Sequence, residues 1–211
     1  MYGSLEVICG PMFSGKTTEL LKRILWASNG QGHKIAVFKP AYDQRYAKMK
    51  LVSHEGLAAD AESIYHWGDT NKQLVKEKVD TVFFDEVQFF TAPHFRGEIV
   101  EIIQSLLESG INVVASGLDM DWKGRSFTIT AMLMGMAEEV TKKKAICAVC
   151  GRPASRSYKK KAEGPQIEVG GTEMYEARCL HHWSMPDNKQ VELFTEFEAI
   201  KPIDMTAANT T

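Results

Sequence analysis

Short apolar runs alternate along the chain with stretches in which apolar residues recur every three or four positions. The runs predict buried strands, and the helical spacing predicts amphipathic helices. The predicted strands are 5–9, 34–39, 81–84 and 111–115, and the predicted helices are 16–28, 71–79 and 95–109. Because strand and helix alternate, we expect parallel βαβ units and an open α/β sheet.

Two regions depart from this alternation. Residues 41–70 are polar and aromatic without a clear period, and we expect them to form a long irregular loop. After Thr141 the chain becomes basic and poor in apolar residues. We therefore expect a nucleotide-binding core over 1–141, a small satellite domain over 142–190, and a C-terminal segment over 191–211 whose last residues, after Pro202, are disordered.

Composition excludes several classes of protein. The chain has 211 residues, 44% of them apolar, and a formal net charge of −2. This balance disfavours a strongly basic nucleic-acid binder and an acidic disordered chain. No apolar run reaches the length of a membrane helix, and no signal peptide is evident, so we expect a cytoplasmic protein. In a reducing compartment its four cysteines are expected to be metal ligands or core residues rather than disulfides.

The segment that follows the first predicted strand fits the pattern of a phosphate-binding loop, G-x-x-x-x-G-K-[ST]. Its residues are Gly10, Pro11, Met12, Phe13, Ser14, Gly15, Lys16 and Thr17. The glycines let backbone N–H groups turn toward a phosphate, Lys16 supplies a charge for the β and γ phosphates, and the Thr17 hydroxyl suits Mg²⁺. The alternative is a glycine turn before a helix; the position between strand and helix favours the phosphate loop.

Two adjacent carboxylates end the strand 81–84. In a phosphate-loop protein, Asp85 would hold Mg²⁺, and Glu86 could act as a general base or orient an attacking water. Taken alone, such a pair would more often be solvated acids at a strand end. Beside a phosphate-loop strand, however, ligand sites gather at the carboxyl ends of strands, which favours the functional interpretation.

Cysteine and histidine spacing predicts a structural zinc site. The pattern is C-x₂-C, 28 intervening residues, then C-x₂-H, with Cys147, Cys150, Cys179 and His182 as the ligands. Three thiolates and one imidazole close a tetrahedral shell, which leaves no position for a catalytic water. His181 is the rival fourth ligand, and the C-x₂ spacing favours His182.

The motifs together resemble the type II thymidine kinase family, the cytosolic zinc-containing kind. The matching stretches are GPMFSGKTTELLKR, FKPAYDQRY, VSHEG, FFDEVQFF, GLDMDWKGRSF and VGGTEMYEARC. The resemblance implies a phosphate-loop, RecA-like parallel sheet with a small C-terminal zinc-binding lasso domain, and a homotetramer. It also implies ATP, Mg²⁺ and structural Zn²⁺ as cofactors, thymidine as substrate and feedback inhibition by TTP.

The resemblance assigns roles to individual positions. Glu86 would be the catalytic carboxylate, and Thr17 and Asp85 the Mg²⁺ ligands. Besides the phosphate loop, ATP would contact Asp43, Arg45, Asp85 and Gln88. The residues that would line the nucleoside pocket are Met12, Phe89, Leu118, Phe127, Gln166, Ile167, Glu168, Val169, Gly170 and Tyr175.

Two other functions remain open on the residues alone. A nucleic-acid-handling ATPase could use the zinc site as a ribbon, although the net charge argues against a basic binding face. A nucleotide switch without enzymatic activity is the weaker alternative. For a thymidine kinase, deoxyuridine could be a secondary substrate, because one methyl group is worth only about 1–3 kcal/mol in recognition.

Overall fold

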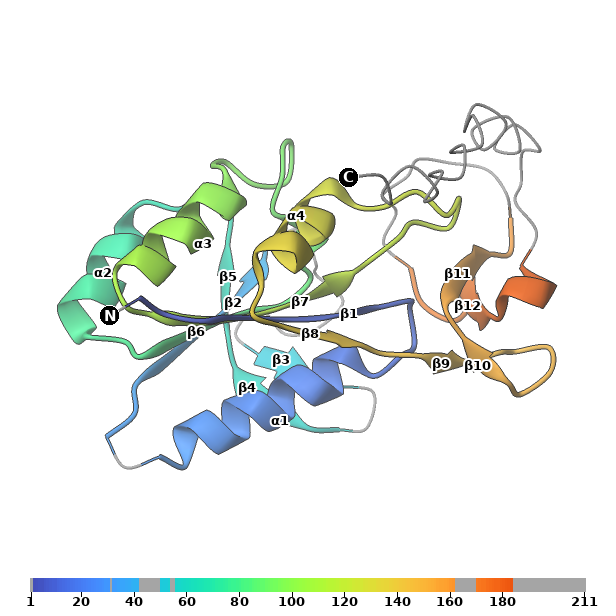
Figure 1. Cartoon of the computed structure of the whole chain (residues 1–211), viewed down its shortest axis with the longest axis horizontal. Helices are drawn as coiled ribbons and strands as arrows, with labels where there is room; N and C mark the ends of the chain where they lie inside the picture. Colours follow the sequence, from blue (N-terminus) through green and yellow to red (C-terminus); the bar gives the residue numbers. More distant parts are fainter. Residues whose placement is uncertain (1, 31, 42–49, 54–55, 162–169, 184–211) are drawn as a thin grey trace, which may run out of the picture.

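The structure, a computed structural model, describes residues 2–30, 32–41, 50–53, 56–161 and 170–183 (Figure 1). Its centre is a six-stranded sheet with the order β5-β2-β6-β7-β1-β8, in which each strand runs parallel to its neighbours. The strands are β1 (Leu5–Gly10), β2 (Ile35–Pro40), β5 (Glu62–Ile64), β6 (Thr81–Phe84), β7 (Asn112–Leu118) and β8 (Glu139–Lys142). The predicted α/β fold with a parallel sheet is confirmed.

Helices cover both faces of this sheet, as an all-parallel sheet requires. They are α1 (Lys16–Ser28), α2 (Asp69–Glu77), α3 (Ile99–Glu108) and α4 (Thr128–Met136). Figure 1 shows α1 on one face and α2, α3 and α4 on the other. A hairpin of β3 (Lys50–Val52) and β4 (Ala58–Asp60) packs beside α1.

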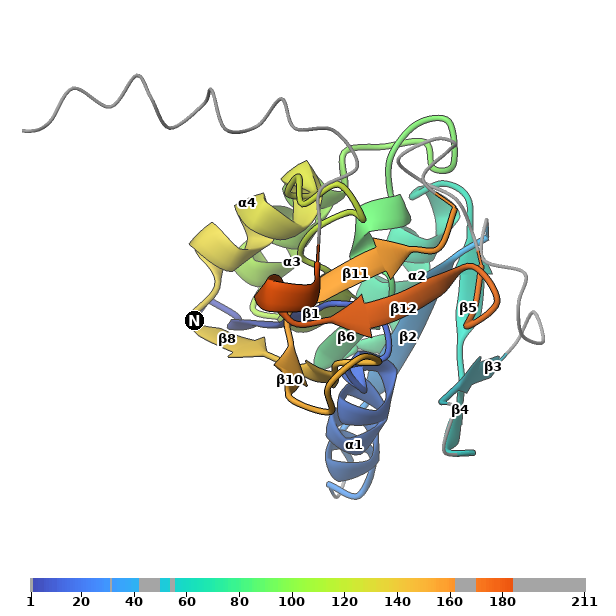
Figure 2. The same cartoon turned by 90° about the vertical axis from the view of Figure 1, so that its right-hand side faces the viewer.

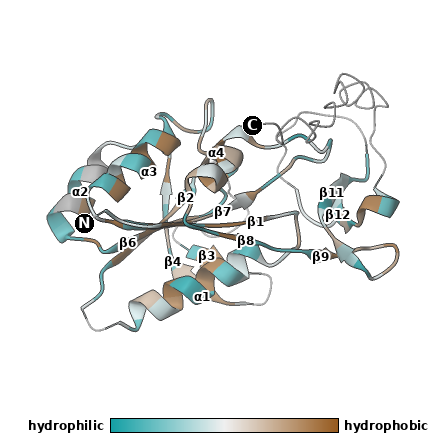
Figure 3. Ribbon diagram, viewed as in Figure 1, coloured by the Kyte–Doolittle hydropathy of each residue, from teal (hydrophilic) through white to brown (hydrophobic). Residues whose placement is uncertain are grey.

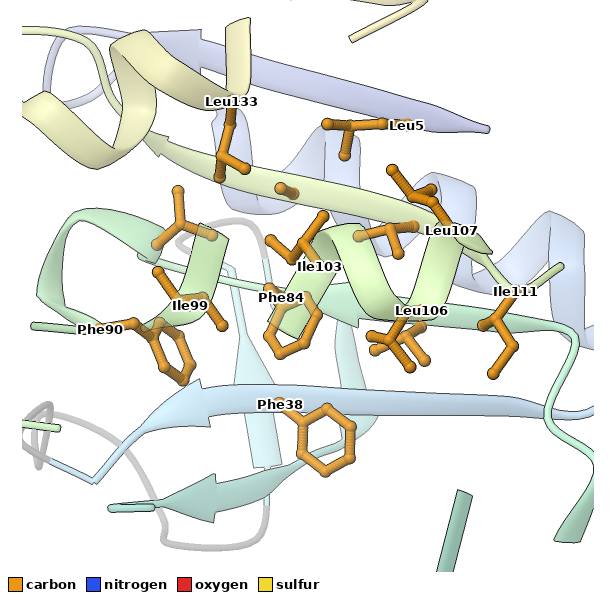
Figure 4. Packing of buried hydrophobic residues seen from close by; sticks show 14 of the residues in the cluster. Leu5, Phe38, Phe84, Phe90, Ile99, Ile103, Leu106, Leu107, Ile111 and Leu133 are labelled. Carbon is orange, nitrogen blue, oxygen red and sulfur yellow. The ribbon is translucent and has the colours of Figure 1, made fainter. Parts of the chain in front are cut away.

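The core lies on both faces because successive strand residues point in opposite directions. On β6, Val82 and Phe84 join the larger cluster with Ile103 of α3, whereas Phe83 joins a second cluster with Leu20 of α1. Figure 4 shows Phe84 beside Ile103 and Leu106 in the larger cluster. Figure 3 shows the apolar colouring along the central strands, which explains why the strands were predictable from apolar runs.

The carboxyl ends of three neighbouring strands meet at one edge of the sheet. Ala115 of β7 pairs with Val7 of β1 on one side and with Phe84 of β6 on the other. The residues that follow these strands, including the segment before α1 and the acids after β6, are therefore neighbours. In Figure 1 this edge points toward the C-terminal strands.

Beyond β8 the chain forms a separate group of short elements. These are β9 (Ala145–Ile146), β10 (Pro153–Ala154), β11 (Arg156–Lys159), β12 (Tyr175–Arg178) and the 3₁₀ turn η2 (Leu180–His182). β9 pairs with β10, and the two strands are antiparallel. β11 pairs with β12, also antiparallel, and Figure 2 shows these two strands side by side. We call residues 143–161 and 170–183 the C-terminal unit.

The predicted helix 95–109 begins later than its apolar spacing suggested. Gly97 has φ 132°, a conformation outside the helical region, and α3 starts at Ile99. Phe95 is buried, but it is held by an edge-on contact with Phe90, with 5.0 Å between ring centroids, rather than by a helix. Phe95 fits the apolar spacing of the helix because it packs into the same core from the preceding loop, which is why the predicted helix began too early.

The expectation of an irregular loop over 41–70 was wrong in part, because β3, β4, β5 and the start of α2 lie within it. Neither α4 nor β8 was predicted. The expected disorder after Pro202 falls outside the described residues. Among the residues described, no helix combines the length and apolar character needed to span a membrane.

Candidate functional site

The segment between β1 and α1 has the backbone of an open loop with several left-handed residues. Gly10 has φ 145°, Phe13 has φ 62° and Gly15 has φ 75°. Gly15 caps α1 and, as a glycine, has no side chain with which to bond the first N–H groups of the helix. These groups and the helix dipole favour an anion at this position.

Lys16 is folded back across this loop. Its Nζ donates a hydrogen bond to the Pro11 carbonyl oxygen at 2.8 Å, and its side chain is buried. Burial lowers the pKa of Lys16, while the carboxylates of Glu86, Asp85 and Asp119 act in the opposite direction. The loop therefore carries a buried cation balanced by acids at the ends of the neighbouring strands.

The structure brings Asp85 to the helix side of the same loop. The Thr17 hydroxyl donates to Asp85 Oδ2 at 3.4 Å, and Asp85 is 4% exposed. Burial, followed by repulsion from Glu86, raises the pKa of Asp85 to about 7. A hydroxyl and a carboxylate this close are the oxygen ligands that Mg²⁺ prefers, so both residues fit the predicted metal site.

Glu86 follows with a left-handed backbone, φ 53°, and is only partly buried. The Gln88 amide nitrogen donates a hydrogen bond to Glu86 Oε2, and its oxygen accepts one from the Leu118 N–H at 2.9 Å. Gln88 is predicted to contact ATP; in this structure its hydrogen bonds run to Glu86 and to the end of β7. It is therefore placed to orient the Glu86 carboxylate.

Two further residues belong to this site and are absent from the roles assigned on the sequence. Asp119 follows β7 as Asp85 follows β6; it is buried, and its Oδ2 lies 2.9 Å from Lys142 Nζ. Gly117 gives Gln88 its space, since a Cβ there would lie 2.7 Å from Gln88 Oε1. The acid after a buried strand was visible in the sequence, whereas the requirement for glycine depends on packing.

The residues predicted to line the nucleoside are divided between two places. Phe89 lies in the 3₁₀ turn η1 (Val87–Phe89), which packs against β7, where Leu118 lies, and against α4, which Phe127 precedes. Phe89 and Phe127 are buried at this junction, whereas Tyr175 is buried in β12 of the C-terminal unit. Outside the described residues lie the predicted positions Asp43, Arg45, Gln166, Ile167, Glu168 and Val169.

The four predicted zinc ligands converge. The Sγ atoms of Cys147, Cys150 and Cys179 and a ring nitrogen of His182 lie within 4.8 Å of one another. The Cys150 and Cys179 sulfurs are 3.8 Å apart, which matches the edge of about 3.8 Å for a tetrahedron with zinc–sulfur bonds of about 2.3 Å. His182, and not His181, belongs to this cluster.

The ionisation of one ligand, Cys147, suits a metal, whereas burial raises the pKa of the Cys179 thiol in the absence of an ion. Burial raises the pKa of the Cys147 thiol, but backbone hydrogen bonds at Cys179, Val149 and Cys150 outweigh it and lower the pKa to about 5. A thiolate is the form that binds zinc. The donor set and its spacing therefore fit a structural zinc ion with a closed shell of protein ligands.

Comparison with protein-family models identifies a family for this chain. The family model described as thymidine kinase matches residues 3–183. The matched span contains the phosphate-loop motif, the Asp85–Glu86 pair and all four residues of the cysteine–histidine cluster.

Proposed function

Since the chain belongs to the thymidine kinase family, we propose that it transfers the γ-phosphate of ATP to the 5′-hydroxyl of thymidine, giving dTMP. One observation supports this assignment most strongly. Asp85, which lies far from Lys16 and Thr17 in the sequence, forms one cluster with them at the opening of α1, and Glu86 follows at its edge. This is the group of residues that phosphoryl transfer from a nucleotide requires.

In the proposed reaction the phosphates of ATP lie on residues 10–17. The N–H groups at the start of α1 and the Lys16 ammonium hold the phosphate oxygens. Thr17 and Asp85 would hold Mg²⁺, which supplies charge compensation for the transferring phosphoryl group. Arg45 and Asp43 are proposed to assist at the phosphates, on the resemblance alone.

Glu86 is proposed as the group that accepts the proton of the attacking 5′-hydroxyl. Its hydrogen bond from Gln88 fixes one carboxylate oxygen. Gln88 is in turn held by the Leu118 amide, so the carboxylate is oriented by the end of β7. Positioning of the reacting groups and electrostatic stabilisation of the transferring phosphoryl group account for most of the rate enhancement in phosphoryl transfer, and removal of the proton adds to it.

The nucleoside is proposed to lie between Phe89, Leu118 and Phe127 on the core side and Tyr175 on the C-terminal unit. Residues 166–170 would read the base through backbone groups. Hydrogen bonds that a wrong base leaves unpaired discriminate strongly, whereas loss of the thymine methyl costs little. We therefore expect deoxyuridine to be a weaker second substrate.

The zinc ion is proposed to be structural. It would join the two ends of the segment between Cys150 and Cys179 and so hold Tyr175 near the core. Residues 1–141 are proposed as the nucleotide-binding core and 142–190 as the lasso domain. A homotetramer, inhibition by TTP and a cytoplasmic location are proposed on the family resemblance.

A coupled kinase assay tests the proposal. The protein is incubated with ATP and Mg²⁺ and with each of the four deoxynucleosides, deoxyuridine, or single-stranded DNA. The proposal predicts ADP release with thymidine, less with deoxyuridine, and none with DNA. ATP turnover that DNA stimulates and thymidine does not would contradict it and favour a nucleic-acid-handling ATPase. Light scattering with and without TTP measures the oligomeric state.

A further inference from the structure

The phosphate loop donates one of its backbone N–H groups to the C-terminal unit. The Met12 N–H forms a hydrogen bond with Ser157 Oγ at 3.0 Å. Ser157 lies in β11 and is 5% exposed. Met12 and Ser157 are 145 positions apart, so this bond joins the loop between β1 and α1 to the C-terminal unit.

Phe13, the next residue, packs against the apolar cluster of the C-terminal unit. This cluster contains Ala145, Cys147, Ala154, Ala177 and Cys179, two of which are zinc ligands. Phe13 has a left-handed backbone, φ 62°. Such a conformation is unfavourable for a non-glycine residue and persists only where its surroundings hold it. The contact with the cluster supplies that support.

Lys143 makes a third connection at the base of the loop. Its N–H donates to the Cys9 carbonyl at 2.7 Å, and its Nζ pairs with Glu19 Oε2 of α1 at 3.1 Å. Its own carbonyl oxygen would lie 2.5 Å from a Cβ at Gly10. The entry to the C-terminal unit is therefore packed against both the strand before the loop and the helix after it.

A continuous series of contacts runs from the zinc ligands to the loop. Ser157 pairs with Ala177 across β11 and β12, two residues before Cys179. The Ala177 carbonyl accepts a hydrogen bond from the Ala148 N–H at 2.9 Å, next to Cys147. The position of Ser157 is thus set by the strand pair that the zinc site closes.

We propose that the zinc-bearing C-terminal unit holds the phosphate loop in its nucleotide-binding shape, with Ser157 as the positioning residue. The inference rests on the proposed function, because it takes residues 10–17 as the nucleotide site. The zinc ion would then have two structural roles. It would hold Tyr175 at the nucleoside, as proposed above, and it would hold the loop that binds ATP. Zinc and nucleotide binding are then coupled, and each strengthens the other.

Calorimetric titration with a non-hydrolysable ATP analogue and Mg²⁺, without nucleoside, tests this coupling. The zinc content of every sample is measured. Ser157→Ala with full zinc is expected to bind the analogue about fivefold more weakly, which corresponds to about 1 kcal/mol, the usual net value of a hydrogen bond. Ser157→Thr keeps the hydroxyl and is expected to restore the affinity. Ser155→Ala is the matched control, since the Ser155 hydroxyl bonds to Arg156 in the same unit and is expected to leave the affinity unchanged.

The second part of the experiment measures analogue binding after zinc has been removed. Chelation is expected to weaken analogue binding in the wild type, and to weaken it by a smaller factor in Ser157→Ala, because the same connection is already broken. If Ser157→Ala fails to retain zinc, Ser157→Cys, with its weaker acceptor, takes its place. Wild-type affinity in a zinc-loaded Ser157→Ala or Ser157→Cys protein would overturn the inference, as would equal affinity of the zinc-loaded and zinc-free wild type. A wild type that binds no analogue would overturn the proposed function as well.

Discussion

Replacing Asp85 with asparagine is expected to make the protein without bound Mg²⁺ more stable at neutral and basic pH. Asp85 is almost fully buried, and burial together with the neighbouring Glu86 raises its pKa from 3.8 to about 7. The folded protein therefore keeps a proton on Asp85 that the unfolded chain has already released. Stability falls as the pH rises through this window, because the folded state binds more protons than the unfolded state.

The size of the effect follows from the shift in pKa. Each tenfold change in an ionisation equilibrium is worth about 1.4 kcal/mol, so the ionised carboxylate destabilises the fold by about 4 kcal/mol above pH 7. At about pH 5.5 roughly half of this cost is present, and between about pH 5.5 and 8.5 it grows by about 2 kcal/mol. The asparagine amide resembles the protonated acid in shape and has no charge, so the variant does not suffer this destabilisation at any pH.

Urea unfolding of wild type and Asp85→Asn at the two pH values measures this difference. The buffers contain no Mg²⁺ or nucleotide, and no chelator, so that zinc is retained. The variant is expected to be the more stable protein, with an advantage about 2 kcal/mol larger at the higher pH. A variant less stable than wild type, or an advantage that does not change with pH, would refute the argument. The stabilised variant is also expected to lose kinase activity, because a proposed Mg²⁺ ligand is gone.

Glu86, Gly117 and the zinc ligands can each be tested by a single substitution. Glu86→Gln is expected to keep the fold and nucleotide binding and to lower kcat roughly 10²–10⁴-fold, the usual effect of removing a general base; near-normal kcat would remove Glu86 from the mechanism. Gly117→Ala is expected to lower the free energy of unfolding by about 1–3 kcal/mol and to lower kcat, because its Cβ would displace Gln88 and Val87. An unchanged kcat in thermally destabilised protein would show that Gln88 does not position Glu86 for the reaction. Metal analysis of freshly purified, reduced protein is expected to find about one zinc per chain, lost in Cys147→Ser; zinc-free protein would contradict the closed site.

The parts of the fold that the sequence predicted are those in which local pattern and burial agree. β6 is apolar on both faces because it lies in the middle of a sheet covered by helices, so its short apolar run identified it. β8 is an edge strand of mixed composition, with Glu139 and Lys142 exposed, and gave no such run. Helix α4 is apolar on most of its surface, including the exposed Met132, so it has no distinct polar face to mark it as a helix.

The candidate site was predictable where its functional residues lie close together in the sequence, in a recognisable pattern. The phosphate-loop motif and the cysteine–histidine spacing each identify their residues without reference to the fold. Gly117 and Ser157 could not be recognised in this way, and the resemblance assigned Gln88 to ATP rather than to Glu86, because the contacts of these residues join segments distant in sequence. The Met12–Ser157 hydrogen bond exists only once the C-terminal unit is folded against the core.

The most direct test of the central claim is identification of the phosphorylated atom. The protein is incubated with ATP, Mg²⁺ and thymidine, and parallel reactions contain 5′-deoxythymidine or 3′-deoxythymidine; the products are analysed by mass spectrometry and phosphorus NMR. The account predicts a 5′-monophosphate from thymidine and from its 3′-deoxy analogue, and no product from the analogue that lacks the 5′-hydroxyl. ADP formed at the same rate with all three compounds, without a nucleoside monophosphate, would contradict it.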